Sequence, residues 1–234
     1  MITVPREKIT EAYVPSRRLL TLLRRGAGSP LEEKALILIG ILSEETRIPM
    51  GFFGVRGSIS LGTSRPGSDI DIAIYGSSNY REVKSALLRL EDERSLELKR
   101  GTRLDRKRLN KGVFRGKDFV VNATRRFSEM GGRPKAYKPH GSVEIECTCA
   151  SVEEAMFRPA IYRVEDCEAV GDTYGALGDV TQIVSMIGTY RDVVSEGERF
   201  RARGMLEEVY DGTGSWRRVV VGSGRPGEYV DWPG

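Results

Sequence analysis

The sequence predicts an α/β (α+β) fold in which a short mixed sheet with flanking helices precedes a small β-rich domain. Near the N-terminus apolar residues recur at helical spacing, and in the middle of the chain they alternate with polar ones as in strands. From about residue 152, short apolar runs are separated by turns rich in Gly and Asp. The 234 residues, 39% of them hydrophobic, can bury one large core or two small ones. We expect two domains, at 1–150 and 151–234.

Two helices are expected near the N-terminus. Residues 16–25 carry leucines at helical spacing and are followed by a glycine. The second helix has a serine cap at Ser29, a proline at its first position, Pro30, and two glutamates in its first turn. The apolar run at 35–42 makes this helix largely buried, and Pro49 lies beyond its end.

The middle of the chain predicts strands around one further helix. Residues 51–55 and 69–75 have strand patterns, and 80–98 has apolar residues along one helical face. Two more strands are expected at 118–124 and 142–148, and we expect them to pair with each other.

The apolar pattern of the C-terminal part predicts several antiparallel strands that form a small barrel. Their apolar runs lie at 160–164, 180–189, 200–209 and 217–221. Cys147 and Cys149 share a strand face with apolar neighbours and are expected to be buried rather than to bind zinc. Together with Cys167 they make an odd count, so no disulfide framework is expected.

Charge is unevenly distributed along the chain. Residues 1–125 hold 24 Lys and Arg against 15 Asp and Glu, whereas 126–234 hold 13 against 18. A basic front half suits a polyanionic ligand such as a triphosphate or RNA. The charged N-terminus has no apolar signal run and the longest apolar stretch is too short to span a bilayer, so we expect a cytoplasmic protein without membrane contact. Abundant Arg and Glu with few Asn and Gln are typical of thermophiles.

The most informative pattern is a pair of aspartates on one strand. Asp69 and Asp71 are two residues apart, so both side chains project from the same face, with Cβ atoms roughly 6–7 Å apart. Unpaired carboxylates this close repel each other, and a divalent ion relieves the repulsion. Hard oxygen ligands suit Mg²⁺ or Mn²⁺, which also bind phosphate oxygens.

A glycine-serine pair precedes the aspartates. Gly57 lets the backbone approach a ligand closely, and the N–H groups after it, together with the Ser58 hydroxyl, can hold phosphate. Arg56 and Arg65 are placed to neutralise phosphate charge, and Ser68 belongs to the turn that enters the aspartate strand.

Gly-Ser, ten residues, then Asp-x-Asp resembles the signature of the polymerase β-type nucleotidyltransferase superfamily, most closely its minimal prokaryotic members. The resemblance is dense over 51–76, and the whole chain is similar to an archaeal family of nucleotidyltransferases with a β-rich C-terminal extension. It implies a polymerase β-like core in which three carboxylates hold Mg²⁺ or Mn²⁺. A hydroxyl acceptor then attacks the α-phosphorus of a nucleoside triphosphate, with ATP as the expected substrate, and pyrophosphate leaves.

The third carboxylate implied by the resemblance has three candidates. Glu144 and Glu146 share the face opposite the buried cysteines, and Asp118 begins the strand before them. We expect Glu146 or Glu144 to complete the metal site with Asp69 and Asp71.

Other features concern the acceptor. Nine basic residues between Lys99 and Lys117 can contact RNA, although such a run is more often a solvated surface. His140 is more simply a turn residue, and Trp216 and Trp232 are more often core or interface anchors than platforms for bases. The Gly-Ser and Asp-x-Asp spacing also resembles antitoxin-type nucleotidyltransferases, which add AMP to a partner protein. A nucleotide- or RNA-binding module with a decayed active site is the remaining alternative.

Overall fold

The computed structural model describes residues 4–171 and 177–232, so residues 1–3 of the charged N-terminal stretch lie outside it. The chain divides into two compact units. The first comprises Met1–Lys99 and Leu109–Thr124, and the second Arg100–Arg108 and Arg125–Gly234. Residue 150, the predicted boundary, lies inside a strand of the second unit, so that unit already begins after residue 124.

The first two helices of the first unit begin within one residue of their predicted starts. After a short 3₁₀ turn at Arg6–Lys8, α1 spans Pro15–Arg25 and α2 spans Pro30–Thr46. The Ser29 side chain accepts a hydrogen bond from the Glu32 backbone N–H at 3.3 Å, which confirms the predicted cap. In the apolar run of α2, Ala35, Leu38, Ile39 and Leu42 are buried and the remaining residues are partly buried, so the helix is largely buried, as expected.

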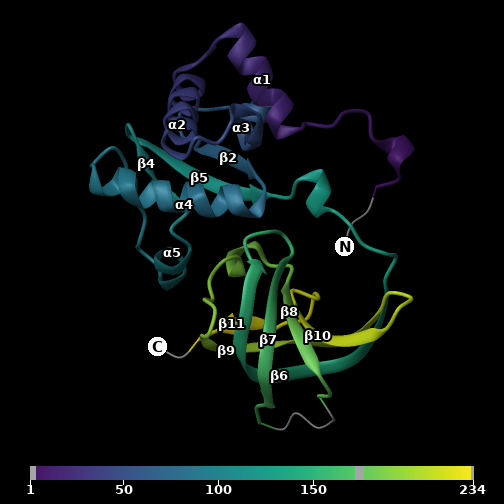
Figure 1. Ribbon diagram of the computed structural model, residues 1–234. Helices are drawn as coiled ribbons and strands as arrows, with labels where there is room; N and C mark the ends of the chain where they lie inside the picture. Colours follow the sequence, from purple (N-terminus) through teal and green to yellow (C-terminus); the bar gives the residue numbers. More distant parts are fainter. Residues whose placement is uncertain (1–3, 172–176, 233–234) are drawn as a thin grey trace. The chain divides into compact units, whose positions relative to one another are not determined.

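The first unit has a five-stranded sheet in the order β1-β2-β5-β4-β3. Its strands β2, β5 and β4 are labelled in Figure 1. Its strands are β1 Phe53–Val55, β2 Ile70–Tyr75, β3 Glu97–Leu98, β4 Lys111–Phe114 and β5 Lys117–Thr124. The central pair β2–β5 is parallel and the other pairs are antiparallel.

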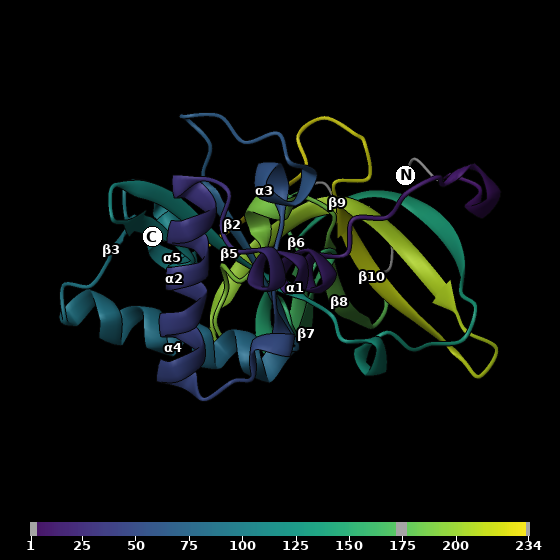
Figure 2. The same cartoon turned by 90° about the horizontal axis from the view of Figure 1, so that it is seen from above.

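Alternation along β2 separates the two faces of this sheet. Ile70, Ile72 and Ile74 are completely buried, whereas on the opposite face Asp71 and Tyr75 are half-buried and only Ala73 is buried. Helices α2 and α4, the latter spanning Ser77–Asp92, both pack on β2 and cross each other (Figure 2).

Two predicted elements are shorter than expected. The strand predicted at 51–55 begins with a 3₁₀ turn, Met50–Phe52, and only β1 is extended. The helix predicted over 80–98 ends at Asp92 because the chain turns back at Arg94, whose φ is +60°. Leu98, expected on the helix, therefore lies in β3.

The second unit contains a closed five-stranded barrel, as expected. Its strands are β6 Ala136–Glu154, β7 Ala160–Ala169, β8 Val180–Ser185, β9 Arg199–Tyr210 and β10 Ser215–Val221. The ring runs β6-β7-β8-β10-β9 and closes on β6, with β11 (Tyr229–Asp231) added to β9. Within the ring β8 and β10 are parallel, and the other pairs are antiparallel.

Cys147 and Cys149 lie in the barrel core with Val143 and Ile145, which confirms their predicted burial. Trp232 is also buried there. The expected pairing of the strands at 118–124 and 142–148 is wrong, because β5 and β6 belong to different sheets. The residues between them, including a 3₁₀ turn at Phe127–Glu129, form a connection rather than a hairpin.

The basic run predicted as one surface is divided between the two units. Its middle part forms α5, Arg103–Arg108, in the second unit, whereas Lys99, Lys111 and Lys117 lie in the first. Across the part of the chain that the structure describes, no helix is long and apolar enough to cross a membrane.

Candidate active site

The site predicted from the sequence is built where β1, α3 and β2 meet. Strand β1 leads through Arg56 into the short helix α3, Gly57–Leu61. The Arg56 backbone N–H donates to the Asp71 carbonyl at 2.9 Å, so the β1–β2 pairing continues to the start of α3. This pairing brings the glycine-serine segment beside the second aspartate.

Gly57 lies so close to the Asp71 carboxylate that a Cβ atom at this position would displace it. Its φ is +55°, a conformation that glycine adopts without strain. A Cβ atom on Gly57 would lie 2.1 Å from Asp71 Oδ2. The sequence predicted that glycine allows a close approach here, and the group that approaches is the aspartate itself.

The surroundings of Asp71 disfavour the ionised form of its carboxyl group. Partial burial raises the pKa of its carboxyl, the neighbouring charge of Asp69 raises it further, and Arg56 opposes both effects. Asp69 lies just before β2 and is exposed. The two aspartates therefore form the repelling pair that the sequence predicted.

The donor chemistry of this pair fits a divalent cation. Two carboxylates that repel each other beside solvent provide hard oxygen ligands with room for further ones. Within residues 4–171 and 177–232, no three His, Cys, Asp or Glu side chains form a group that could hold a metal ion. The aspartates are thus a pair in this arrangement and not a complete three-carboxylate set.

The loop between α3 and β2 is fixed by short-range hydrogen bonds. The Ser64 hydroxyl donates to Ser58 Oγ at 3.4 Å. The Arg65 backbone N–H donates to Ser68 Oγ at 2.9 Å, and the Ser68 N–H donates back to the Arg65 carbonyl. Lys117 Nζ donates to the Pro66 carbonyl, which attaches the loop to β5.

A pocket of about 380 Å³ adjoins Gly57. Its lining comes from α1 and the segment before it, from α3 with the residue ahead of it, and from the end of β5: Tyr13, Pro15, Arg56, Gly57, Ser60, Leu61 and Thr124. Tyr13 and Thr124 were not predicted as site residues, because they are far from the motif in sequence and only the tertiary fold brings them to it.

Asp118 lies on the strand next to the aspartate pair. Parallel pairing sets Ile70 opposite Phe119, so Asp118 is level with Asp69 and lies on the same face of the sheet as Asp71. Its carboxylate forms an ion pair with Lys99 Nζ at 2.6 Å, and its side chain is 57% exposed.

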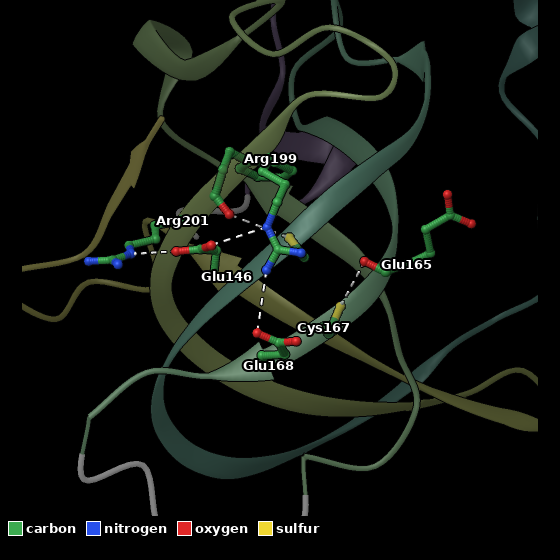
Figure 3. Close-up of polar contacts among 8 residues, drawn as sticks. Glu146, Glu165, Cys167, Glu168, Arg199 and Arg201 are labelled. Atoms are coloured by element: carbon green, nitrogen blue, oxygen red, sulfur yellow. Dashed lines mark hydrogen bonds and ion pairs between the residues drawn. The ribbon is translucent and has the colours of Figure 1, made fainter. Parts of the chain in front are cut away.

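Glu144 and Glu146 lie on the outer face of the barrel in the second unit. Arg199 and Arg201 donate to the two oxygens of Glu146 at 3.1 and 3.0 Å and flank it (Figure 3). These bonds lower the pKa of Glu146. Glu144 accepts a hydrogen bond from the Tyr229 hydroxyl at 2.7 Å. We expected Glu144 or Glu146 as the third carboxylate because their strand was predicted to pair with the strand at 118–124. Strands β5 and β6 do not pair.

His140 also belongs to the barrel. It lies within β6 rather than in the predicted turn, and its Nε2 is 3.2 Å from a carboxylate oxygen of Glu208. This contact connects β6 to β9, so it accounts for the histidine as part of the strand pairing.

Comparison with known proteins supports the motif. Residues 39–123 match the family model described as nucleotidyltransferase domain. This segment includes β1, α3, β2, α4 and nearly all of β5, and with them Gly57, Ser58, Asp69 and Asp71. The chain therefore contains a nucleotidyltransferase domain, consistent with the polymerase β type.

A relative extends the similarity beyond that domain. The uncharacterized protein MJ1086 of Methanocaldococcus jannaschii is 30% identical over 226 residues. The match covers 86% of this chain and 64% of the relative, so the chain spans less than two thirds of that protein. No solved structure matches the chain.

Proposed function

We propose that the protein transfers a nucleoside monophosphate from a nucleoside triphosphate to a hydroxyl acceptor, in a reaction that depends on Mg²⁺ or Mn²⁺ and releases pyrophosphate. One observation carries the proposal: the Asp71 carboxylate lies against Gly57, next to Asp69. A phosphate-binding segment and a metal-binding pair are then adjacent, as attack on a metal-bound triphosphate requires.

Each residue has a role in this proposal. Asp69 and Asp71 would hold the divalent cation, which would neutralise triphosphate charge. The backbone N–H groups after Gly57 and the Ser58 hydroxyl bind phosphate oxygens. Arg56 and Arg65 add positive charge, and Ser68 fixes the turn that carries Asp69. Positioning and charge neutralisation supply most of the rate.

The reaction is an in-line displacement at the α-phosphorus. The acceptor oxygen forms a bond to phosphorus, the bond from phosphorus to the bridging oxygen of the β-phosphate breaks, and pyrophosphate leaves with that electron pair. The proton of the acceptor hydroxyl passes to a carboxylate and then to solvent.

We place Asp118 ahead of Glu146 and Glu144 as that third carboxylate. Strand pairing supports this order, because Asp118 is level with Asp69 on the neighbouring strand, about 5 Å away at the backbone. The ion pair between Lys99 and Asp118 is exposed at the surface, so a metal ion or the acceptor can replace Lys99 as the partner of Asp118.

Finer features follow from the same proposal. ATP is the triphosphate we expect, and the cytoplasm, where triphosphates are made and used, is the compartment. RNA is the acceptor we favour, and the alternatives are a protein hydroxyl, as an antitoxin-type enzyme would use, or a small-molecule hydroxyl.

Pyrophosphate release tests the proposal. Each of the four nucleoside triphosphates is supplied with Mg²⁺ or Mn²⁺ and a mixed RNA pool, and wild type is compared with Asp69→Asn, Asp71→Asn and the control Asp92→Asn. We expect release by wild type and the control, and a loss of at least about 100-fold in the first two variants.

Two outcomes would reject or change this function. Triphosphate binding without release in any condition would favour a binding module whose active site has decayed. Release that is equal in wild type and both aspartate variants would remove the catalytic role of the pair.

A further inference from the structure

The barrel of the second unit carries two aromatic side chains, Tyr137 and Trp216, that have no role in the site of the first unit. Strand pairing sets Tyr137 of β6 and Trp216 of β10 on either side of Val209 of β9, on the same face. Their Cα atoms are therefore about 10 Å apart, two strand spacings. Tyr137 is 50% exposed and Trp216 is half-buried, whereas Val209 between them is covered.

The strand register shows on which side of the barrel the rings of Tyr137 and Trp216 lie. Leu206 and Val219 pair with each other and belong to the barrel core. Glu207 follows Leu206 in β9 and Arg218 precedes Val219 in β10, so both side chains point outward. Val209 is two residues from Glu207 and Trp216 is two residues from Arg218, so these side chains point outward as well. The two rings thus lie on the outside of the barrel.

Cations accompany both rings. Arg218 lies over the Tyr137 ring, 4.5 Å from its centroid, and Lys135 Nζ lies 5.3 Å from the centroid of Trp216. Such cations hold the aromatic side chains in place through attraction to the ring faces. The Trp216 indole N–H also donates to Gln182 Oε1 at 3.3 Å, which fixes the orientation of its ring.

A row of polar side chains continues this surface across the next strands. The register places Arg163 of β7 beside Gln182 of β8, Gln182 beside Arg218, and Arg218 beside Glu207. Glu207 is the only acid in this row, and both its contacts with Arg218, at 2.8 and 3.0 Å, neutralise it. We call this surface the aromatic face; it consists of Lys135, Tyr137, Arg163, Gln182, Trp216 and Arg218.

We propose that the aromatic face binds single-stranded nucleic acid by stacking bases on Tyr137 and Trp216. The two rings lie on the strands that flank β9, beside Lys135, Arg163 and a neutralised acid. This arrangement matches a ligand that combines flat bases with a negative backbone. Small five-stranded barrels often bind oligonucleotides, but this likeness of fold alone would not locate the site. In a chain that transfers nucleotides, the bound strand is the acceptor; this last step rests on the proposed function.

Stacking rather than charge supplies the affinity. Because Arg218 is paired with Glu207, only Lys135 and Arg163 supply uncompensated positive charge on the aromatic face. At most about two phosphates are then neutralised, and log K should fall with log salt by a slope of no more than about 1.4. Binding of the phosphate backbone by the nine basic residues between Lys99 and Lys117 would give a steeper dependence of log K on log salt.

The test uses the full chain and fluorescence anisotropy of labelled twelve-nucleotide oligo-U and oligo-dT, with EDTA and without triphosphate, so transfer is not needed. We expect binding of oligo-U, weakened about 5- to 140-fold by Tyr137→Ala and by Trp216→Ala, because each stacked base contributes about 1–3 kcal/mol. Tyr137→Phe, which keeps the ring, should bind within about twofold of wild type.

Matched controls separate this result from misfolding and from catalysis. Phe127, the most exposed aromatic of the described residues at 87%, loses a ring elsewhere in Phe127→Ala and should bind normally. Tyr137 is exposed, so Tyr137→Ala should melt at the temperature of wild type even if the half-buried Trp216 variant does not. Asp71→Asn should bind oligo-U normally while losing pyrophosphate release.

Three outcomes would overturn the proposal. These are no binding of either oligonucleotide by wild type, binding that neither ring variant weakens, and a salt slope well above about 1.4. Binding of a protein partner that depends on the two rings, with no oligonucleotide binding, would assign the surface to protein recognition instead. Equal binding of oligo-U and oligo-dT would identify the ligand as any single strand, whereas preference for oligo-U would identify RNA.

Discussion

At the scale of single residues, the contact between Gly57 and Asp71 is the feature that the sequence could not predict. The motif spacing predicted both residues and their roles, because strand alternation and glycine chemistry are local properties. The 2.1 Å separation that a Cβ at Gly57 would have from Asp71 Oδ2 is a tertiary property and depends on the β1–β2 register. The same applies to Tyr13, which joins the site only through the fold.

Replacement of this glycine gives the first prediction. Gly57→Ala should lower transfer by at least about 100-fold, since the new methyl group displaces the Asp71 carboxylate. Gly62→Ala is the matched control, because Gly62 also has a positive φ, +69°, but no atom lies within 4 Å of its Cβ position. Both variants should lose about 1 kcal/mol of stability from backbone strain. Equal loss of activity in both would show that backbone strain, and not the contact, is responsible.

Asp71 gives a prediction about pH. Its pKa is raised, so the folded state binds the proton more tightly than the unfolded chain, and the stability conferred is lost as pH rises through the raised pKa. In EDTA, Asp71→Asn should therefore melt at a higher temperature than wild type at pH 7, with the difference shrinking toward pH 3. Thermal melts across this range measure it. A variant that is less stable than wild type at pH 7 would contradict the repulsion between the two aspartates.

At the scale of elements, most helices and strands agree with the sequence, and the exceptions have local causes. The cap at Ser29 and the alternation in β2 are short-range signals, and both are present as predicted. The length of β6 and its partners were not predictable, because apolar alternation specifies that a strand has a buried face but not which strand covers it.

Substitution of Glu146, on strand β6, distinguishes a structural role of this glutamate from a catalytic one. Hydrogen bonds from Arg201 and Arg199 lower the pKa of Glu146, so its contribution to stability is present above its ordinary pKa and is lost as pH falls through the lowered one. Glu146→Gln should lower the melting temperature slightly at pH 7, with no difference at low pH, and should leave pyrophosphate release unchanged.

Asp118→Asn is the counterpart of that variant on β5. It removes the carboxylate paired with Lys99, so we expect pyrophosphate release to fall while stability changes little, since the pair is at the surface. Full activity in Asp118→Asn together with its loss in Glu146→Gln would restore the glutamate as the third carboxylate.

At the scale of the whole molecule, the chain consists of two compact units, each with its own sheet. The sequence predicted a domain followed by a barrel, but not the boundary and not the transfer of Arg100–Arg108 to the second unit. Closure of the barrel by the parallel pair β8–β10 joins strands distant in sequence, which no periodicity reveals.

Ligand binding should therefore stabilise one unit more than the other. A triphosphate with Mg²⁺ at about 100 times its Kd adds about 2.7 kcal/mol to the state that binds it. Calorimetry should show an upward shift in one of two transitions in wild type and no shift in Asp71→Asn. An equal shift of both transitions would contradict a site confined to the first unit.

The central claim is that the chain transfers the nucleotidyl group, and the position of a radioactive label tests it most directly. Wild type is incubated with Mg²⁺ or Mn²⁺, a mixed RNA pool and ATP labelled at either the α- or the γ-phosphate. We expect label from the α-phosphate to become attached to RNA or protein and label from the γ-phosphate to be released as pyrophosphate. Asp71→Asn should do neither. Attachment of the γ-label, or its release as single phosphate, would contradict nucleotidyl transfer.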